Sequence, residues 1–179
     1  MRRLLRWMVG VLAVLLASFV LGILAFDLMT VRPVVSRIED QLSAAATSER
    51  LPSAAVMDML GRAYGGRINN LVADRALWTE GTRPPPNLPT RVGVALLLSV
   101  HLSEAKIASA YLSTAYMGPG IYGFAAASQH YLGIPLDLVN LEQAAKLVAI
   151  AHAPRFYSLV PERLERRTRY LLSLPGRAN

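Results

Sequence analysis

The sequence predicts an all-α protein with one N-terminal transmembrane helix. No stretch alternates strictly between apolar and polar residues over the length of a strand, whereas alanine and leucine recur at helical spacing. The run from Trp7 to Phe26 contains no charged residue, and a helix of about 20 residues crosses a hydrocarbon layer of about 30 Å. We therefore expect residues 1–30 to form a membrane anchor and residues 31–179 to form one helical domain.

The charges beside the apolar run predict its orientation. Arg2, Arg3 and Arg6 precede it, and positive charge on a short flank favours the cytoplasmic side. We expect the N-terminus to remain inside and the rest of the chain to be exported. A cleaved secretory signal is the alternative, but the apolar run is longer than the usual 7 to 15 or so residues and no clear small-x-small cleavage site follows it.

Breakers and capping residues divide the exported part into short helices. The proline-rich TEGTRPPPNLP at residues 79–89 predicts a loop, because consecutive prolines remove backbone donors. Ser103 and Asn140 are suited to begin helices, and Gly133 is suited to end one. The apolar segment 92–102 is either a central buried helix or a helix lying against the membrane. The expected helices cover residues 34–46, 52–60, 68–78, 92–102, 103–117, 121–132 and 140–153, followed by an amphipathic helix within RLERRTRYLLSLPGR.

Composition limits the chemistry. The chain has no cysteine, and its three histidines are widely separated, so composition gives no support for a metal or other cofactor. The formal charge is +7, and much of it lies beside the anchor and in the C-terminal amphipathic segment. Anionic lipid headgroups or a diphosphate are therefore expected partners rather than nucleic acid, and a solvated surface helix is the alternative for that segment.

Two stretches carry a resemblance to a known family. They read YLSTAYMGPGIYGFAAASQHYLG and VNLEQAAKLVAIAHAPRFYSLVP. Together they resemble the C-terminal half of the glycosyltransferase family 51 domain, the peptidoglycan transglycosylase module, in its monofunctional form. The resemblance implies a lysozyme-like helical fold in the bacterial inner membrane, facing the periplasm or cell exterior. The matching positions are Tyr111, Leu112, Gly118, Gly120, Tyr122, Gly123, Ala126, Ala127, Tyr131, Gly133, Ala144, Ala145, Leu147, Pro154 and Tyr157.

Physically, these residues are mainly scaffold. Glycines beside Pro119 allow a sharp turn, and the alanines allow close helix crossing. We expect Tyr111 and Tyr122 to be core aromatic residues with hydrogen-bonded hydroxyl groups. In the family, one glutamate acts as general base on the acceptor sugar. A second glutamate, basic residues and often a divalent cation stabilise the leaving diphosphate.

The N-terminal motifs of the family are degenerate here. Glu39 and Asp40 supply an acidic pair, but Ser43 stands in place of phenylalanine and no histidine follows. The segment GGRINNLV is a shortened form of the second motif. In the third motif, RVGVA, Arg91 matches but Ala95 replaces the second glutamate. By resemblance, the candidate catalytic residue is Glu39, and the candidate substrate-binding residues are Arg67, Asn69, Asn70 and Arg91.

Three functions remain open at this level. We favour a membrane-anchored transglycosylase-like domain with impaired or lost catalysis, which binds lipid II or a related polyprenyl-diphosphate glycan or docks onto a cell-wall synthase. The first alternative is an active transglycosylase that polymerises lipid II with Glu39 or Glu49 as general base. The second is a structural membrane protein that binds only a protein partner.

Overall fold

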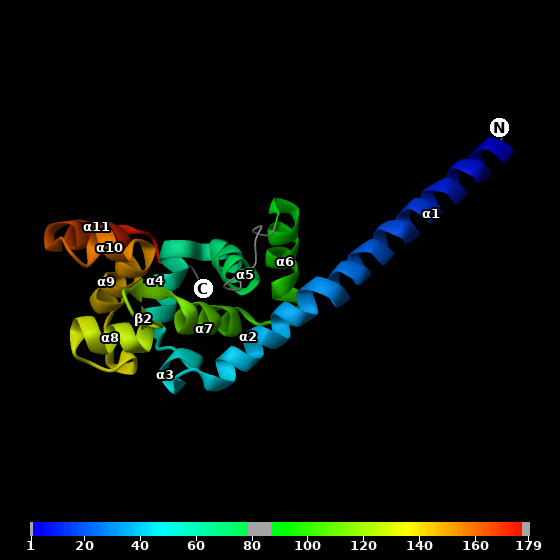
Figure 1. Cartoon of the computed structure of the whole chain (residues 1–179). Helices are drawn as coiled ribbons and strands as arrows, with labels where there is room; N and C mark the ends of the chain where they lie inside the picture. The colour runs from blue at the N-terminus through cyan, green and yellow to red at the C-terminus, as the bar shows by residue number, and fades with distance from the viewer. Residues whose placement is uncertain (1, 79–86, 177–179) are drawn as a thin grey trace.

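The computed structural model describes residues 2–78 and 87–176, with side chains from Arg6 onward, and it confirms the all-α prediction (Figure 1). The helices are α1 (Arg2–Phe26), α2 (Arg32–Ala44), α3 (Thr47–Arg50), α4 (Ala54–Tyr64), α5 (Ile68–Leu77), α6 (Leu88–His101), α7 (Glu104–Thr114), α8 (Phe124–Leu132), α9 (Leu141–His152), α10 (Pro154–Tyr157) and α11 (Pro161–Ser173). The shorter turns are the π-helical turn η1 (Asp27–Val31) and the 3-10 turns η2 (Gly65–Arg67) and η3 (Leu136–Leu138). Within the described residues, the only strands are β1 (Tyr116–Gly118) and β2 (Ile121–Tyr122).

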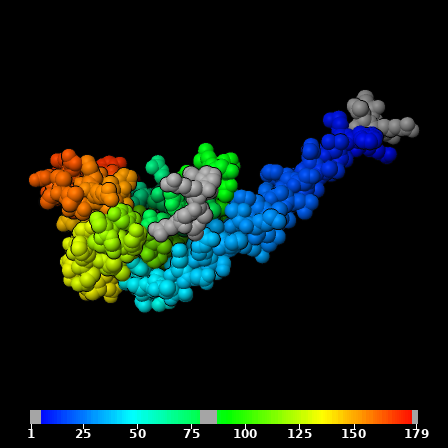
Figure 2. All heavy atoms as spheres, viewed as in Figure 1, coloured from blue at the N-terminus to red at the C-terminus, as the bar shows by residue number. Residues whose placement is uncertain are grey.

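Helix α1 projects from the rest of the molecule as a single rod, as Figures 1 and 2 show. It continues through η1 into α2, and only the latter part of this rod packs against the helical domain. The apolar part of α1 is long enough to cross a membrane, and its side chains are not covered by the rest of the protein. Such a surface is stable in hydrocarbon and unfavourable in water.

The helical domain is built on two hydrophobic clusters. The larger one surrounds α9, whose Ala144, Ala145 and Ala149 let α4 and α8 approach closely. The smaller cluster lies where α2, α5, α6 and α7 meet, and includes Ile38, Val72 and Leu98. The side chains of Ile68 and Tyr111 pack against both clusters and so connect them.

Several helix ends follow the predicted capping chemistry. Asn140 and Gln143 form a reciprocal capping box at the start of α9. Ser103 accepts a hydrogen bond from the backbone N–H of Lys106 at the start of α7. Gly133 ends α8 in the left-handed conformation. At the C-terminus, α11 is amphipathic as predicted and buries Leu171 in the larger cluster.

Four local predictions are wrong. The expected helix 103–117 ends at Thr114 and the expected helix 121–132 begins only at Phe124, because residues 116–122 form the hairpin of β1 and β2. Tyr122 lies on this hairpin and is exposed rather than in the core. The predicted loop at residues 79–89 ends earlier than expected, since Asn87 caps α6 and Leu88 begins it; residues 79–86 of that loop lie outside the described part of the chain.

Candidate functional site

Glu39 lies on α2 and faces α7. Its carboxylate is half exposed and forms an ion pair with the ammonium group of Lys106, at 2.8 Å. Glu39 is not among the residues that line the hollows described below. The negative charge of this candidate base is therefore already matched by a cation on a neighbouring helix.

Asn69 lies at the start of α5, beside the turn at Gly65 and Gly66. Its side-chain amide is 3.4 Å from the backbone oxygen of Ala95, which it approaches as donor. It lines a hollow of about 130 Å³, together with the two glycines and with Ser99 and Glu104 from α6 and α7. Arg67 and Asn70, the neighbouring candidates, are exposed and are not among the lining residues of this hollow.

Arg91 lies on the first turns of α6 and forms a two-pronged ion pair with Asp74 of α5. Bidentate pairing of this kind holds a guanidinium group in one orientation. Both side chains remain partly exposed, so Arg91 can still meet an anion from solvent. The pair ties α5 to α6 near one edge of the groove described next, because Asp74 lines that groove.

Two adjoining hollows form one groove, which we call the aromatic groove. The first, of about 570 Å³, and the second, of about 300 Å³, share Leu71, Arg75 and Tyr116. Arg75 is held in place by donating a hydrogen bond to the backbone oxygen of Thr114. The remaining lining residues of the two hollows are Asp74, Trp78, Tyr111, Thr114, Ala115, Tyr122, Ala151, His152 and Pro154.

The chemistry of the aromatic groove suits a polar ligand with apolar faces. Trp78 and Tyr122 expose large ring surfaces, and the rings of Tyr116 and Tyr122 are 5.5 Å apart. Asp74 and Arg75 add an acceptor and donors beside these rings. The sequence alone does not single out these residues as a binding site. Two signals point to them: Tyr122 belongs to GPGIYG, within the first stretch that resembles the family, and Arg75 and Trp78 are three residues apart, a spacing that places them on one face of a helix.

Tyr111 lines the inner part of the groove and is the core aromatic residue that the sequence predicted. Its hydroxyl donates a 2.9 Å hydrogen bond to the hydroxyl of Tyr64, and the two rings meet edge to face. Burial raises the pKa of both phenols. They therefore stay protonated at neutral pH and are unsuited to act as bases.

Glu49, the alternative candidate base, is a buried carboxylate with a structural partner. It lies on α3 and accepts a 2.8 Å hydrogen bond from the backbone N–H of Ala125 in the first turn of α8. Burial raises its pKa, and hydrogen bonds from backbone N–H groups oppose that shift. This carboxylate is therefore already engaged as a hydrogen-bond acceptor for the backbone at the start of α8.

Position 95, where the resemblance implies the second glutamate, belongs to the core. Ala95 is 4% exposed and packs in the smaller hydrophobic cluster with Val94 and Leu98. A methyl group there can neither stabilise a diphosphate nor bind a metal. Within residues 2–78 and 87–176, no group of three or more histidine, aspartate and glutamate side chains comes together in a way that could hold a metal ion. The described residues therefore do not fit the divalent cation that the resemblance allows.

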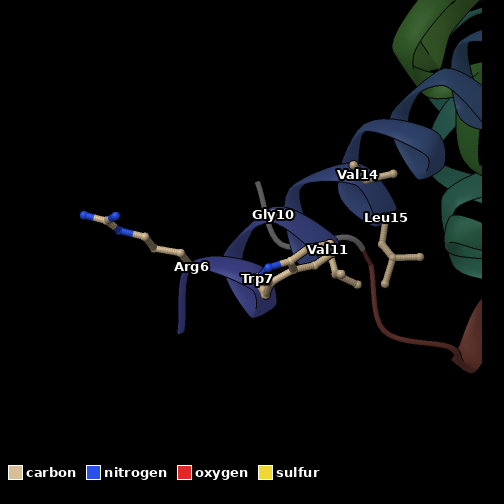
Figure 3. Close-up of a pocket in the computed structure, with 6 residues that line it drawn as sticks. All are labelled: Arg6, Trp7, Gly10, Val11, Val14 and Leu15. Carbon is tan, nitrogen blue, oxygen red and sulfur yellow. The ribbon is translucent and has the colours of Figure 1, made fainter. Parts of the chain in front are cut away.

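The hollow beside the first turns of α1 is not a ligand site of this domain. Its lining residues all lie on one bare helix, as Figure 3 shows. They are mainly apolar, with Arg6 at the end nearest the N-terminus. Lipid chains would cover such a surface in a membrane.

The comparisons with known proteins agree with this architecture. The model of the family described as Transglycosylase matches residues 90–174. The biosynthetic peptidoglycan transglycosylase of Bordetella avium is 40% identical over 109 residues, which cover 61% of this chain and 43% of that protein. The protein of the same name from Nitrosomonas eutropha is 38% identical over 82 residues, covering 45% of this chain and 34% of that protein.

A protein of another name shows the same likeness over a shorter stretch. Penicillin-binding protein 2a of Streptococcus pneumoniae is 38% identical over 65 residues, which are 36% of this chain and 9% of that protein. The chain matches less than half the length of each of these relatives. The match to the family model covers α6 to α11, the part in which the sequence motifs are best kept. Residues 90–174 therefore match the peptidoglycan transglycosylase family, glycosyltransferase family 51, whose domain is lysozyme-like.

Proposed function

We propose that this protein is a membrane-anchored transglycosylase-like domain of bacterial cell-wall assembly, which binds a lipid-linked glycan diphosphate such as lipid II but has little or no power to polymerise it. The observation that carries the proposal is the burial of Ala95 in the apolar cluster at the place of the second glutamate. Family 51 chemistry needs cationic and acidic groups where charge develops on the leaving diphosphate. A buried methyl group supplies none of this stabilisation.

The position of Glu39 supports the same proposal. A general base must lie within hydrogen-bonding reach of the proton that it removes. Glu39 instead pairs with Lys106 across 2.8 Å, so an acceptor hydroxyl would have to displace this ammonium group to reach the carboxylate. Arg91 and the aromatic groove leave a surface that can still hold a diphosphate and sugar rings.

The proposed topology has the anchor at residues 1–30 and the helical domain at 31–179, on the periplasmic or outer face of the inner membrane. The supporting observations are the uncovered apolar surface of α1 and the arginines at its N-terminal end. The variant Glu162→Cys tests this topology, because the chain has no other cysteine that a thiol reagent could label. Labelling by a membrane-impermeant maleimide in cells whose outer membrane is permeabilised is expected, and labelling only after the inner membrane is lysed would reverse the topology.

Incubation of the full chain with fluorescent lipid II in detergent micelles tests the activity. We expect binding without glycan polymer, alongside an active transglycosylase as positive control. Polymer that disappears in the Glu39→Gln variant would instead establish the active enzyme. Absence of lipid II binding would favour a structural membrane protein that binds only a protein partner. Docking onto a cell-wall synthase would add to the proposal, and co-purification from crosslinked cells tests it.

A further inference from the structure

Helix α6 carries an apolar stripe that no other described part of the protein covers. Its residues recur every four positions and are largely exposed: Leu88 by 68%, Val92 by 44%, Leu96 by 68% and Val100 by 72%. The opposite face of the same helix is buried through Val94, Ala95 and Leu98. A helix that is apolar on both faces, with only one face packed, needs a second apolar environment.

The stripe is continuous with the uncovered surface of α1. Gly93 brings the two helices together, since a Cβ atom added there would lie 2.9 Å from the ring of Phe26. Beyond this contact the two helices flank an open, almost wholly apolar hollow of about 530 Å³. It is lined by Ser18, Phe19, Gly22, Ile23 and Phe26 from α1 and by Gly93, Leu96 and Leu97 from α6.

Polar groups mark where this apolar zone ends. The ring Nε2 of His101, at the C-terminal end of α6, lies 2.6 Å from a carboxylate oxygen of Asp27. Arg32 donates a 3.2 Å hydrogen bond to the other oxygen of the same carboxylate. Asp27 directly follows the last apolar residue of α1. This group of three charged or titratable side chains is therefore suited to the level of the lipid headgroups.

The depth of α6 follows from helix geometry. If Phe26 lies at the edge of the hydrocarbon, Ile23 lies roughly 4.5 Å deeper and Phe19 roughly 10 Å deeper along α1. Leu96 and Leu97 share a hollow with both residues. A helix held at that depth beside the anchor lies where interfacial amphipathic helices reside, about 5–10 Å into the boundary between headgroups and acyl chains.

We propose that α6 is a second membrane contact of this protein, with its Leu88–Val92–Leu96–Val100 stripe in the outer part of the hydrocarbon and acyl chains filling the hollow between α1 and α6. The proposal rests on the insertion of α1 that is proposed above, but not on any binding of lipid II. The fold thereby holds the α5–α6 side of the domain, including Arg91, close to the membrane surface.

Site-directed fluorescence tests this on the full chain, one copy per lipid nanodisc. Single cysteines replace Leu96 or Val92, and each carries an environment-sensitive nitrobenzoxadiazole dye. Leu15→Cys on α1 reports insertion of the anchor. Ser99→Cys is the matched control on α6, because Ser99 is also exposed but lines the hollow beside Asn69 and not the apolar hollow between α1 and α6. We expect the dyes at positions 92 and 96 to be blue-shifted, quenched by doxyl-labelled lipids and shielded from iodide, whereas the dye at position 99 is open to iodide.

The outcomes separate this proposal from the others. Dyes at positions 92 and 96 that respond to iodide as strongly as the dye at position 99, while the dye at position 15 is lipid-quenched, would overturn the contact of α6 and leave the anchor intact. A blue shift at positions 92 and 96 that appears only when two or more copies share a nanodisc would identify a second copy as the occupant and would also overturn the lipid contact. Loss of lipid quenching at position 15 would instead refute the anchor.

Discussion

The carboxylate of Glu49 accepts a hydrogen bond from the backbone N–H of Ala125, 76 residues further along the chain. Glu49 is 5% exposed, so this contact connects α3 to the start of α8 inside the protein. The first backbone N–H groups of a helix have no partner within it, and an acidic side chain from another segment satisfies them here.

Replacing Glu49 by alanine should therefore destabilise the domain by about 1–3 kcal/mol, because a buried N–H loses its partner. Glu49→Gln keeps an oxygen at the same place and should cost much less. Urea unfolding in detergent micelles at neutral pH, followed by circular dichroism, measures both variants. Equal loss in the two variants would show that the charge, rather than the hydrogen bond, matters at this site.

The same carboxylate predicts a pH effect with a definite sign. Burial raises the pKa of Glu49 above its ordinary value of 4.5, so the folded state binds a proton at pH values at which the unfolded chain has already lost it. The contribution of Glu49 to the free energy of unfolding is then fully present below about pH 4 and falls as pH rises through the raised pKa. Relative to Glu49→Gln, the wild type should lose stability as the pH rises from the ordinary value of 4.5 through the raised pKa. A difference that grows in favour of the wild type over that range would show a lowered pKa instead.

Gly123 should tolerate no side chain. Its φ is +83°, and an added Cβ would lie 2.5 Å from the Oε1 atom of Glu49 and 3.2 Å from the backbone oxygen of Ser113. Gly133→Ala is a matched control, since its φ is +70° but nothing lies within 4 Å of the added Cβ. We expect Gly133→Ala to cost about 1 kcal/mol from backbone strain alone, and Gly123→Ala to cost about 3 kcal/mol or more because the clash adds to the strain. Thermal unfolding measures both, and similar losses would mean that Glu49 moves aside easily.

The elements that the sequence located well are those with local signals. The capping box of Asn140 and Gln143, the cap at Ser103 and the left-handed Gly133 each depend on residues within one turn of each other. The hairpin of β1 and β2 was missed because its strands are too short to show alternation, and its glycines read equally well as a helix–helix turn.

The candidate site was harder to predict, because its partners are distant in sequence. Arg91 was selected from its motif, but its pairing with Asp74 depends on how α5 and α6 pack. Lys106 beside Glu39 likewise comes from a helix 67 residues away. The segment 92–102 was expected to be either buried or membrane-facing. The structure shows one buried face and one uncovered apolar face on the same helix, which a purely apolar sequence cannot distinguish.

Introducing a glutamate at position 95, where the resemblance places the second acid, should destabilise the fold rather than yield glycan polymer. Ala95→Glu would place a carboxylate in the smaller hydrophobic cluster, and the variant should lose several kcal/mol of stability. Ala105→Glu makes the same substitution at an exposed position of α7 and should be nearly neutral. Urea unfolding and lipid II polymerisation together check this. A stable Ala95→Glu variant that makes glycan polymer would show that the family's cleft is intact around position 95.

The ion pair between Arg91 and Asp74 allows a final test of ligand binding. If Arg91 meets a diphosphate, Asp74 competes with that ligand for the same guanidinium group. Arg91→Ala should therefore weaken the binding of lipid II several-fold, whereas Asp74→Ala should leave binding unchanged or strengthen it. Fluorescence anisotropy of labelled lipid II at low and high salt measures both, with Arg163→Ala on α11 as an exposed cationic control. Equal weakening by Arg91→Ala and Asp74→Ala would mean that the pair serves only to hold α5 against α6, since then each loss would act through the fold rather than through contact with the ligand.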